Sequence, residues 1–224
     1  MLPPIIHQDD RLFVVDKPTG LLSVPGIGPE KADCLISRMQ AEFPEARIVH
    51  RLDRDTSGVI ILARDADSHR ELSRQFHDRE VEKTYHALVA DHIANDSGHI
   101  DLPLRKDLEN TPRHIVDHEL GRPSQTDWKV TSRGTLGDLD EKIACAGADA
   151  RRPVSRVELS PRTGRSHQLR VHLTSIGHPI LGDDLYAPKE AVEATHRLCL
   201  HATRVWFVHP ETASPMVFSS PPPF

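Results

Sequence analysis

Short apolar runs separated by polar turns dominate this chain and favour strands over helices. Strands are predicted over residues 11–18, 83–91, 125–133, 153–161 and 199–210, and the third and fourth of these alternate between apolar and polar positions. Two more apolar runs, "ARIV" and "VIILA", predict a strand on each side of the polar stretch "HRLDRDTSG" at residues 50–58. A polar connection between two buried strands is a common place for catalytic groups.

Helical spacing is found in three places. Apolar residues at positions 32, 35, 36, 39 and 43 predict a helix over 31–43 that stops at Pro44, and Leu72 and Phe76 lie on one face of a charged helix over 66–80. A third helix is predicted over 165–177, ending at Gly177. The interval 92–124 reads as irregular, and the stretch between 133 and 153 reads as a surface loop. The pattern therefore predicts a mixed α+β domain with few helices.

Length and composition are those of a soluble globular protein. The 224 residues suit one large domain or two small ones, and 38% apolar with 27% charged residues is ordinary. No apolar run reaches the length of a membrane helix, and the start of the chain does not resemble a signal peptide. The three cysteines, Cys34, Cys145 and Cys199, show no pairing motif. We therefore expect free thiols and a cytoplasmic location.

Charge is unevenly distributed along the chain. The net charge of −5 argues against a polyanionic partner, but residues 151–172 contain six arginines and two histidines against one acid, Glu158. Residues 134–150 are acidic by contrast, which predicts that this segment faces away from any nucleic acid. Arginine forms bidentate contacts with phosphate and stacks on bases, so the cluster is compatible either with a solvated strand face or with RNA binding.

Asp53 is the first candidate for chemistry. Its neighbours Arg51 and Arg54 allow a simple surface ion pair. A carboxylate next to guanidinium groups also stays ionised at neutral pH, as a nucleophile requires, and the distant segment "RTGRSHQLR" offers more arginine.

The segment around Asp53 also supports a second interpretation, an aspartyl phosphatase. Asp53 would attack phosphorus, Asp55 would act as the acid, and Asp183 with Asp184 would hold Mg²⁺. Ser57 replaces the Thr or Val expected at the fifth position of that signature, and a strand-like run follows at once. Activity that survives EDTA would exclude this alternative.

The fifteen histidines do not form a recognisable metal motif. The tightest pair, His114 and His118, lies between Pro112 and Pro123 and has no third ligand at a suitable spacing. We therefore predict no metal site. Tyr85 is one of only two tyrosines; in a strand it is either a core residue or a flat face for stacking.

Five blocks of sequence resemble the RluA-type pseudouridine synthases. "HRLDRDTSGVIILAR" resembles the catalytic motif of that family, "FVVDKPTGLLSVPG" its first motif, and "REVEKTYHALV" the strand with its active-site tyrosine. "PRTGRSHQLRVHLTSIGHPILGDDLYA" and "LCLHATRVWFVHP" resemble its third motif and closing segment. The blocks follow the family order from about residue 5 to the end, and several matched blocks are more specific than one short motif.

The resemblance implies a fold and a reaction. It implies a single catalytic domain over residues 1–224, built on a mixed, mainly antiparallel bent sheet, without the S4-like RNA-binding domain of many members. It implies isomerisation of uridine in RNA to pseudouridine without metal or organic cofactor. Asp53 would be the catalytic carboxylate, Arg165 would pair with it, and Tyr85 would stack on the target uracil.

The resemblance also implies an RNA partner whose target base is flipped out of its stack. Arg51 would enter the vacated space or contact a phosphate, and Arg162, His167 and Arg170 would bind the RNA backbone. Members without the S4-like domain suggest large-subunit rRNA and the tRNA anticodon stem-loop as substrates, and we expect a monomer. A non-catalytic RNA-binding module on the same fold is the third hypothesis, and the joint presence of Asp53, Tyr85 and Arg165 argues against it.

Overall fold

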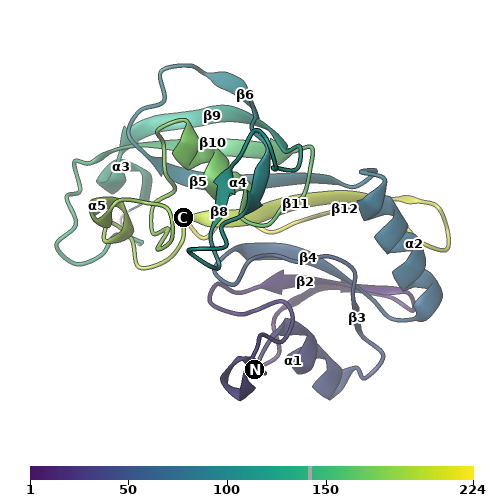
Figure 1. The fold of residues 1–224 in the computed structure, drawn as a ribbon. Helices are drawn as coiled ribbons and strands as arrows, with labels where there is room; N and C mark the ends of the chain where they lie inside the picture. The colour runs from purple at the N-terminus through teal and green to yellow at the C-terminus, as the bar shows by residue number, and fades with distance from the viewer. Residues whose placement is uncertain (141–142) are drawn as a thin grey trace. The chain divides into compact units, whose positions relative to one another are not determined.

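Segments far apart in the chain combine into two structural units (Figure 1). The computed structural model describes residues 1–140 and 143–224. Unit 1 comprises Met1–Lys83 and His201–Pro222, and unit 2 comprises Thr84–Leu200 and Pro223–Phe224. Each unit is described by itself, and a single domain over the whole chain stays a prediction.

The sheet of unit 1 is mixed. Its strands are β1 (Ile5–Gln8), β2 (Leu12–Lys17), β3 (Arg47–Ile48), β4 (Ser57–Ala63), β11 (Leu200–Val208) and β12 (Pro215–Ser219). β4 pairs antiparallel with β2 and β3 but parallel with β11, whereas β1 with β2 and β11 with β12 are antiparallel pairs. Every residue of β4 is buried, so the strand that follows the polar stretch 50–58 is a rigid support.

The helices of unit 1 begin and end where local chemistry requires it. The short 3-10 turn η1 (Pro29–Lys31) precedes α1 (Leu35–Glu42), which ends at Phe43 before Pro44. α2 (Ala66–His77) starts after Asp65, whose carboxylate accepts hydrogen bonds from the backbone N–H groups of Asp67 at 2.9 Å and Ser68 at 2.8 Å. Both predicted helices are present, but α1 begins at Leu35 rather than at residue 31, and α2 ends at His77 rather than at residue 80.

The main sheet of unit 2 is antiparallel. Its strand order is β5 (Glu82–Ala90), β10 (Pro153–Pro161), β9 (Gln125–Thr135) and β6 (Ser97–Asp101). β7 (Leu104–Lys106) and β8 (His114–Val116) form a separate two-stranded hairpin. Three short helices complete the unit: α3 (Leu136–Asp140), α4 (Gln168–Ser175) and α5 (Lys189–Val192).

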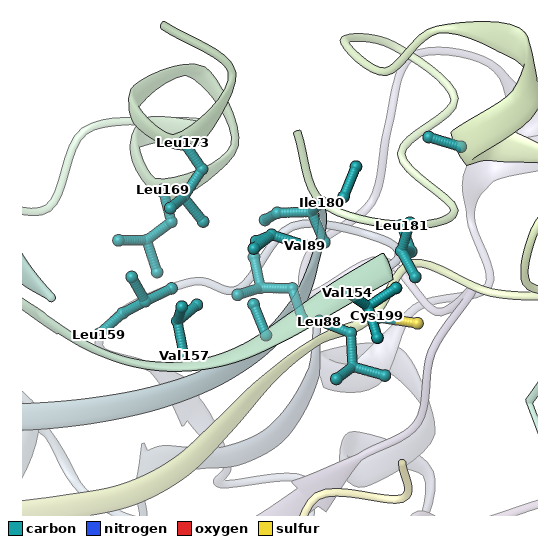
Figure 2. Close-up of a cluster of buried hydrophobic side chains, with 14 of the residues drawn as sticks. Leu88, Val89, Val154, Val157, Leu159, Leu169, Leu173, Ile180, Leu181 and Cys199 are labelled. Carbon is teal, nitrogen blue, oxygen red and sulfur yellow. The ribbon is translucent and has the colours of Figure 1, made fainter. Parts of the chain in front are cut away.

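One helix closes the core of unit 2. Figure 2 shows Leu169 and Leu173 of α4 directed toward Val157 and Leu159 of β10. Leu173, Val157 and Leu159 are fully buried, and burial of such side chains stabilises the unit by roughly 1.5–3 kcal/mol each. This packing fixes α4 against the sheet, and with it the arginine-rich segment that precedes the helix.

Three predictions about loops and helix ends require correction. The interval 92–124 is not irregular, because it contains β6, β7 and β8. The stretch between 133 and 153 begins with α3 and buries Leu136 and Ile143, while Glu141 and Lys142 of its acidic segment lie outside the described residues. α4 begins at Gln168 rather than at residue 165, because His167 adopts a left-handed conformation with φ of 56°.

The fold class is confirmed as α+β, with a mixed, mostly antiparallel strand arrangement and few helices. Within the described residues, no helix combines the length and apolar character needed to cross a membrane.

Candidate active site

Three polar side chains hold the backbone on both sides of Asp53. The Lys17 ammonium is completely buried and donates to the carbonyl oxygens of Pro18 at 3.0 Å, Leu21 at 2.7 Å and Arg54 at 2.9 Å. Thr19 Oγ1 donates to the carbonyl of Asp55 at 2.7 Å. The backbone is therefore bound on the C-terminal side of Asp53 by the turn that follows β2.

Ser23 completes this clamp on the N-terminal side of Asp53. Its buried hydroxyl donates to the Leu52 carbonyl at 2.7 Å and accepts from the Leu52 N–H at 3.1 Å. We refer to Lys17, Thr19 and Ser23 as the motif clamp. Asp53 itself is partly buried and, within the described residues of unit 1, makes no hydrogen bond or ion pair. The clamp therefore fixes the backbone and leaves the carboxylate available.

A close approach of two strands supports the end of the same motif. Gly58 has φ of +110°, and a Cβ there would lie 2.2 Å from the carbonyl oxygen of Ala202, so β4 and β11 can pair only with glycine at this position. Ser57 Oγ hydrogen-bonds Nδ1 of the buried His201 at 2.8 Å, and Nε2 of His201 hydrogen-bonds the Ser220 carbonyl at 3.1 Å. A carbonyl can only accept, so Nε2 carries the proton, and in the neutral imidazole Nδ1 accepts from the Ser57 hydroxyl.

His50 starts the motif as a neutral side chain. Its Nε2 accepts the Ile61 N–H at 3.0 Å, just beyond the β3–β4 pairing, and its ring stacks on Phe76 at 4.2 Å between centroids. Burial, with a smaller contribution from the positive charge of Lys83, lowers the pKa of His50 to about 3. His50 is thus a structural acceptor at neutral pH rather than a proton donor.

The sequence indicates the first motif, but it does not reveal the roles of the side chains in that motif. Its letters "DKPTGLLS" contain all three members of the motif clamp. A lysine two residues before a glycine-containing turn is an ordinary surface feature in a single sequence. Only the fold shows that its ammonium is buried among carbonyl oxygens.

The predicted site residues are divided between the two units. Unit 1 contains Arg51 and Asp53, and unit 2 contains Tyr85, Arg162, Arg165, His167 and Arg170. Arg51 is exposed and, within the described part of unit 1, has no hydrogen-bond or ion-pair partner. The pairing of Arg165 with Asp53 stays a prediction.

Tyr85 lies on β5 opposite Leu159 of β10. Its ring is partly buried and packs against the hydrophobic core of unit 2. This anchoring holds one part of the aromatic face still, as a stacking residue requires.

Gln168 fixes the turn that carries Arg165. The buried Gln168 Oε1 accepts from the Arg165 N–H at 3.0 Å and from Thr163 Oγ1 at 2.7 Å. Its Nε2 donates to the Gln125 carbonyl at 2.9 Å and to Thr126 Oγ1 at 3.0 Å. All hydrogen-bonding atoms of this amide are engaged, so the backbone of the arginine segment is held on β9.

Two of the predicted RNA-binding residues are accessible, to different degrees. The Arg162 side chain is 62% exposed, and its Nε donates to Asp127 at 2.5 Å. Asp127 also pairs with His99 at 2.7 Å, and the two partners, Arg162 first, lower its pKa. His167 is partly buried and hydrogen-bonds the Tyr186 hydroxyl through Nδ1 at 2.6 Å.

The prediction for Arg170 requires correction. This side chain is 3% exposed and forms a two-pronged ion pair with the buried Asp183, at 2.8 Å through Nε and 2.5 Å through Nη2. A guanidinium enclosed in this way holds two segments together and is not placed to bind an RNA phosphate.

The same ion pair counts against the phosphatase interpretation. Both Asp183 oxygens are used: Oδ2 by Arg170, and Oδ1 by Arg170 and the N–H groups of Leu185 and Tyr186. Asp55 is bound by its neighbour Arg54 at 2.9 Å. The carboxylates required for Mg²⁺ and for acid catalysis are therefore committed to protein partners.

Comparison with known proteins gives a consistent result. The family described as RNA pseudouridylate synthase matches residues 11–175. The chain is 48% identical over 214 residues to the dual-specificity RNA pseudouridine synthase RluA of Yersinia pestis, covering 96% of each chain. It is 44% identical over 220 residues to the protein of the same name from Escherichia coli strain K12, covering 98% of this chain and 93% of that one.

Solved structures show the same likeness. Human RNA pseudouridylate synthase domain containing 1 is similar with a TM-score of 0.79 at 28% identity, covering 99% of this chain and 84% of the human chain. Human RNA pseudouridylate synthase domain containing 4 shares the fold, with a TM-score of 0.71 at 22% identity and coverage of 98% and 88%.

Proposed function

Because the chain belongs to the RNA pseudouridylate synthase family and isomerises uridine in RNA, we propose that Asp53 is the carboxylate on which this isomerisation depends. The observation that carries the assignment is the motif clamp. Lys17, Thr19 and Ser23 bind the backbone on both sides of Asp53 and leave its carboxylate free within unit 1. A surface ion pair needs no such support, whereas a reacting group must be held to within a fraction of an ångström.

The reaction is a rearrangement in which all atoms are retained. The bond between N1 of uracil and C1′ of ribose breaks, the base turns, and C5 bonds to C1′. C5 loses its proton and N1 gains one, so the reaction has no net oxidation or reduction and needs no electron carrier. Whether Asp53 attacks C1′, attacks C6 of the base or removes the 2′ proton, it acts as an ionised carboxylate.

Residues of unit 2 complete the proposal. Arg165 pairs with Asp53 and keeps it ionised, and Tyr85 stacks on the target uracil. The support comes from the fixed backbone of Arg165 and the anchored ring of Tyr85. Arg51, Arg162 and His167 contact the RNA, which must release the target base from its stack.

The proposed substrates are large-subunit rRNA and the tRNA anticodon stem-loop. The support is the identity of 48% and 44% to two proteins named dual-specificity RNA pseudouridine synthase. We further propose that the protein acts as a cytoplasmic monomer without a cofactor. Mapping pseudouridine in rRNA and tRNA from cells that lack the gene tests the substrates: restoring the wild-type protein should restore both sets of sites, and loss of either class alone would contradict dual specificity.

Asp53→Asn and Asp55→Asn form a matched pair of variants for the catalytic assignment. The first should abolish pseudouridine formation, measured by release of tritium from C5-labelled uridine, while RNA binding persists. The second should retain much of the activity, and neither EDTA nor added Mg²⁺ should change the chemical step. Substantial turnover by Asp53→Asn, or equal loss in both variants, would show that the assignment is wrong.

A further inference from the structure

The end of the HRLDRDTSG motif is paired with two strands of unit 1. β4 and β11 run parallel, and His201 of β11 lies directly opposite Ser57 of β4. β2 lies on the other side of β4, with Lys17 opposite Gly58 (Figure 1). Lys17, Ser57 and His201 are all buried, so their polar side-chain atoms depend on partners within the protein.

Ser220, which directly follows β12, makes hydrogen bonds in two directions. Its carbonyl accepts from His201 Nε2 at 3.1 Å, and its hydroxyl donates to Asp16 Oδ2 at 2.8 Å. The serine backbone is also held, because its N–H donates to the Thr203 carbonyl at 2.9 Å. Ser220 is buried, so these bonds are shielded from competition with water.

Asp16 and Lys17 connect Ser220 to the loop that carries Asp53. Neighbouring residues of a strand point to opposite faces, so Asp16 reaches Ser220 while Lys17 reaches the Arg54 carbonyl at 2.9 Å. A shift of β2 at this point would therefore strain the contacts on both faces of the strand.

The path closes through His201. From Arg54 the chain continues to Ser57, whose hydroxyl is hydrogen-bonded to His201 Nδ1 at 2.8 Å, and His201 Nε2 leads back to the Ser220 carbonyl. We refer to Asp16, Lys17, Ser57, His201 and Ser220 as the motif ring. His201 alone bridges the loop and the segment after β12 in this ring, because it accepts through one ring nitrogen and donates through the other.

We propose that His201 is a positioning residue for the isomerisation, which closes the motif ring and so fixes the chain on the C-terminal side of Asp53. The inference rests on the proposed function, because it takes Asp53 as the reacting carboxylate. The motif clamp binds the backbone as far as Asp55, and the ring adds a fixed point at Ser57. A buried polar network whose members are satisfied holds one arrangement, as a reacting group requires.

Loss of the imidazole should lower turnover without lowering RNA affinity. His201→Phe keeps a flat ring and removes both nitrogen atoms; kcat should fall about tenfold or more, because Asp53 is no longer held in place. Kd for a stem-loop RNA should be unchanged, since the residue is buried. His201→Gln supplies a donor and an acceptor in one side chain, and it should recover part of the lost kcat.

Two serines that are adjacent in sequence provide a matched pair of variants. Ser220→Ala breaks the bond to Asp16 but leaves the carbonyl that His201 uses, so kcat should fall about threefold or more. Ser219→Ala, at an exposed serine of β12, is the control and should leave kcat unchanged. Ser57→Ala together with Ser220→Ala should lower kcat little more than the more severe single variant does, because one break already opens the ring.

Folding is measured separately, so that a loss of stability is not mistaken for a loss of positioning. Urea unfolding gives the folded fraction of each variant, and kcat is compared per folded molecule. Wild-type kcat in folded His201→Phe, a raised Kd with normal kcat, or losses that multiply in the double variant would overturn the inference. If His201→Phe does not fold, the same kcat in Ser220→Ala and Ser219→Ala would overturn it. Wild-type protein without turnover would contradict the proposed function, whereas active wild type with equally active ring variants contradicts the inference alone.

Discussion

His50 is neutral in the folded protein because its ring nitrogen is used as an acceptor. The N–H of Ile61 points at Nε2 where the β3–β4 pairing ends, so the imidazole replaces the missing backbone acceptor. A proton on that nitrogen would break this bond and introduce a charge next to Phe76 and near Lys83. The first residue of the HRLDRDTSG motif therefore holds the strand that follows the motif, and residue type alone does not reveal this.

Acid sensitivity of folding follows from this state of His50. Its pKa is about 3 in the folded protein and about 6.5 when unfolded, so the unfolded chain binds the extra proton between these values. The contribution to stability is complete above pH 6.5 and falls as pH decreases toward 3. In urea unfolding at pH 4.5–6.5, His50→Gln should lose part of the pH dependence of wild type, up to about 1.4 kcal/mol per pH unit. Equal slopes in both proteins would contradict this account.

The turn after β2 and the loop before β4 behave as one element. Lys17, Thr19 and Ser23 come from the turn, and the groups they bind, on Leu52, Arg54 and Asp55, come from the loop. Side-chain donors reach the backbone rather than the side chain of the loop, so the contacts are independent of the residues at 53–55. This is a means of fixing a catalytic loop without occupying its functional group.

Ser23→Ala tests this element. The substitution leaves the N–H and C=O of Leu52 without their partner, and the shift of Asp53 should reduce kcat about tenfold or more. RNA affinity should be unchanged, because the serine is buried and does not face solvent. Ser97→Ala, at an exposed serine of β6, is the matched control. A change in Kd with normal kcat would show that Ser23 acts in some other way.

Across the whole chain, the ion pairs that each cation forms describe the charge distribution better than the net charge does. Many arginines of this acidic protein are neutralised locally; Arg74, for example, is bound by Glu71, Asp78 and Glu80. Cations that have no acidic partner therefore indicate possible RNA contacts better than the net charge of −5 does. Arg51 is of this kind within the described part of unit 1.

Arg51→Ala tests whether such a cation handles the flipped base. Unstacking a base costs a few kcal/mol, so a residue that fills the vacated space should matter only when a stack must be opened. We expect a large loss of kcat/KM on a stem-loop and a small one on a short RNA with an unstacked uridine. Arg70→Ala, at a 77% exposed arginine of α2, is the control. Equal losses on both RNAs would favour a simple phosphate contact.

The sequence by itself determined most of the secondary structure, through the local pattern of apolar residues, and the family, through its motifs. Apolar residues predicted the long strands and the helices α1, α2 and α4, because the apolar side chains of these elements are buried. The motif blocks predicted the family and singled out Asp53, Tyr85 and Arg165, because that chemistry requires specific residue types in a specific order.

Tertiary structure alone decided the rest. The short strand β6 lacks a local signal, because it is stabilised by pairing with β9, more than 20 residues away, and β7 and β8 are only three residues long each, too short to show a period. Arg170 and Lys17 look like surface cations in the sequence, and their burial depends on partners, Asp183 and the Arg54 carbonyl, that lie 13 and 37 residues away. Whether a polar side chain binds substrate or protein is set by which groups the fold brings within hydrogen-bonding distance, and composition and periodicity do not contain that information.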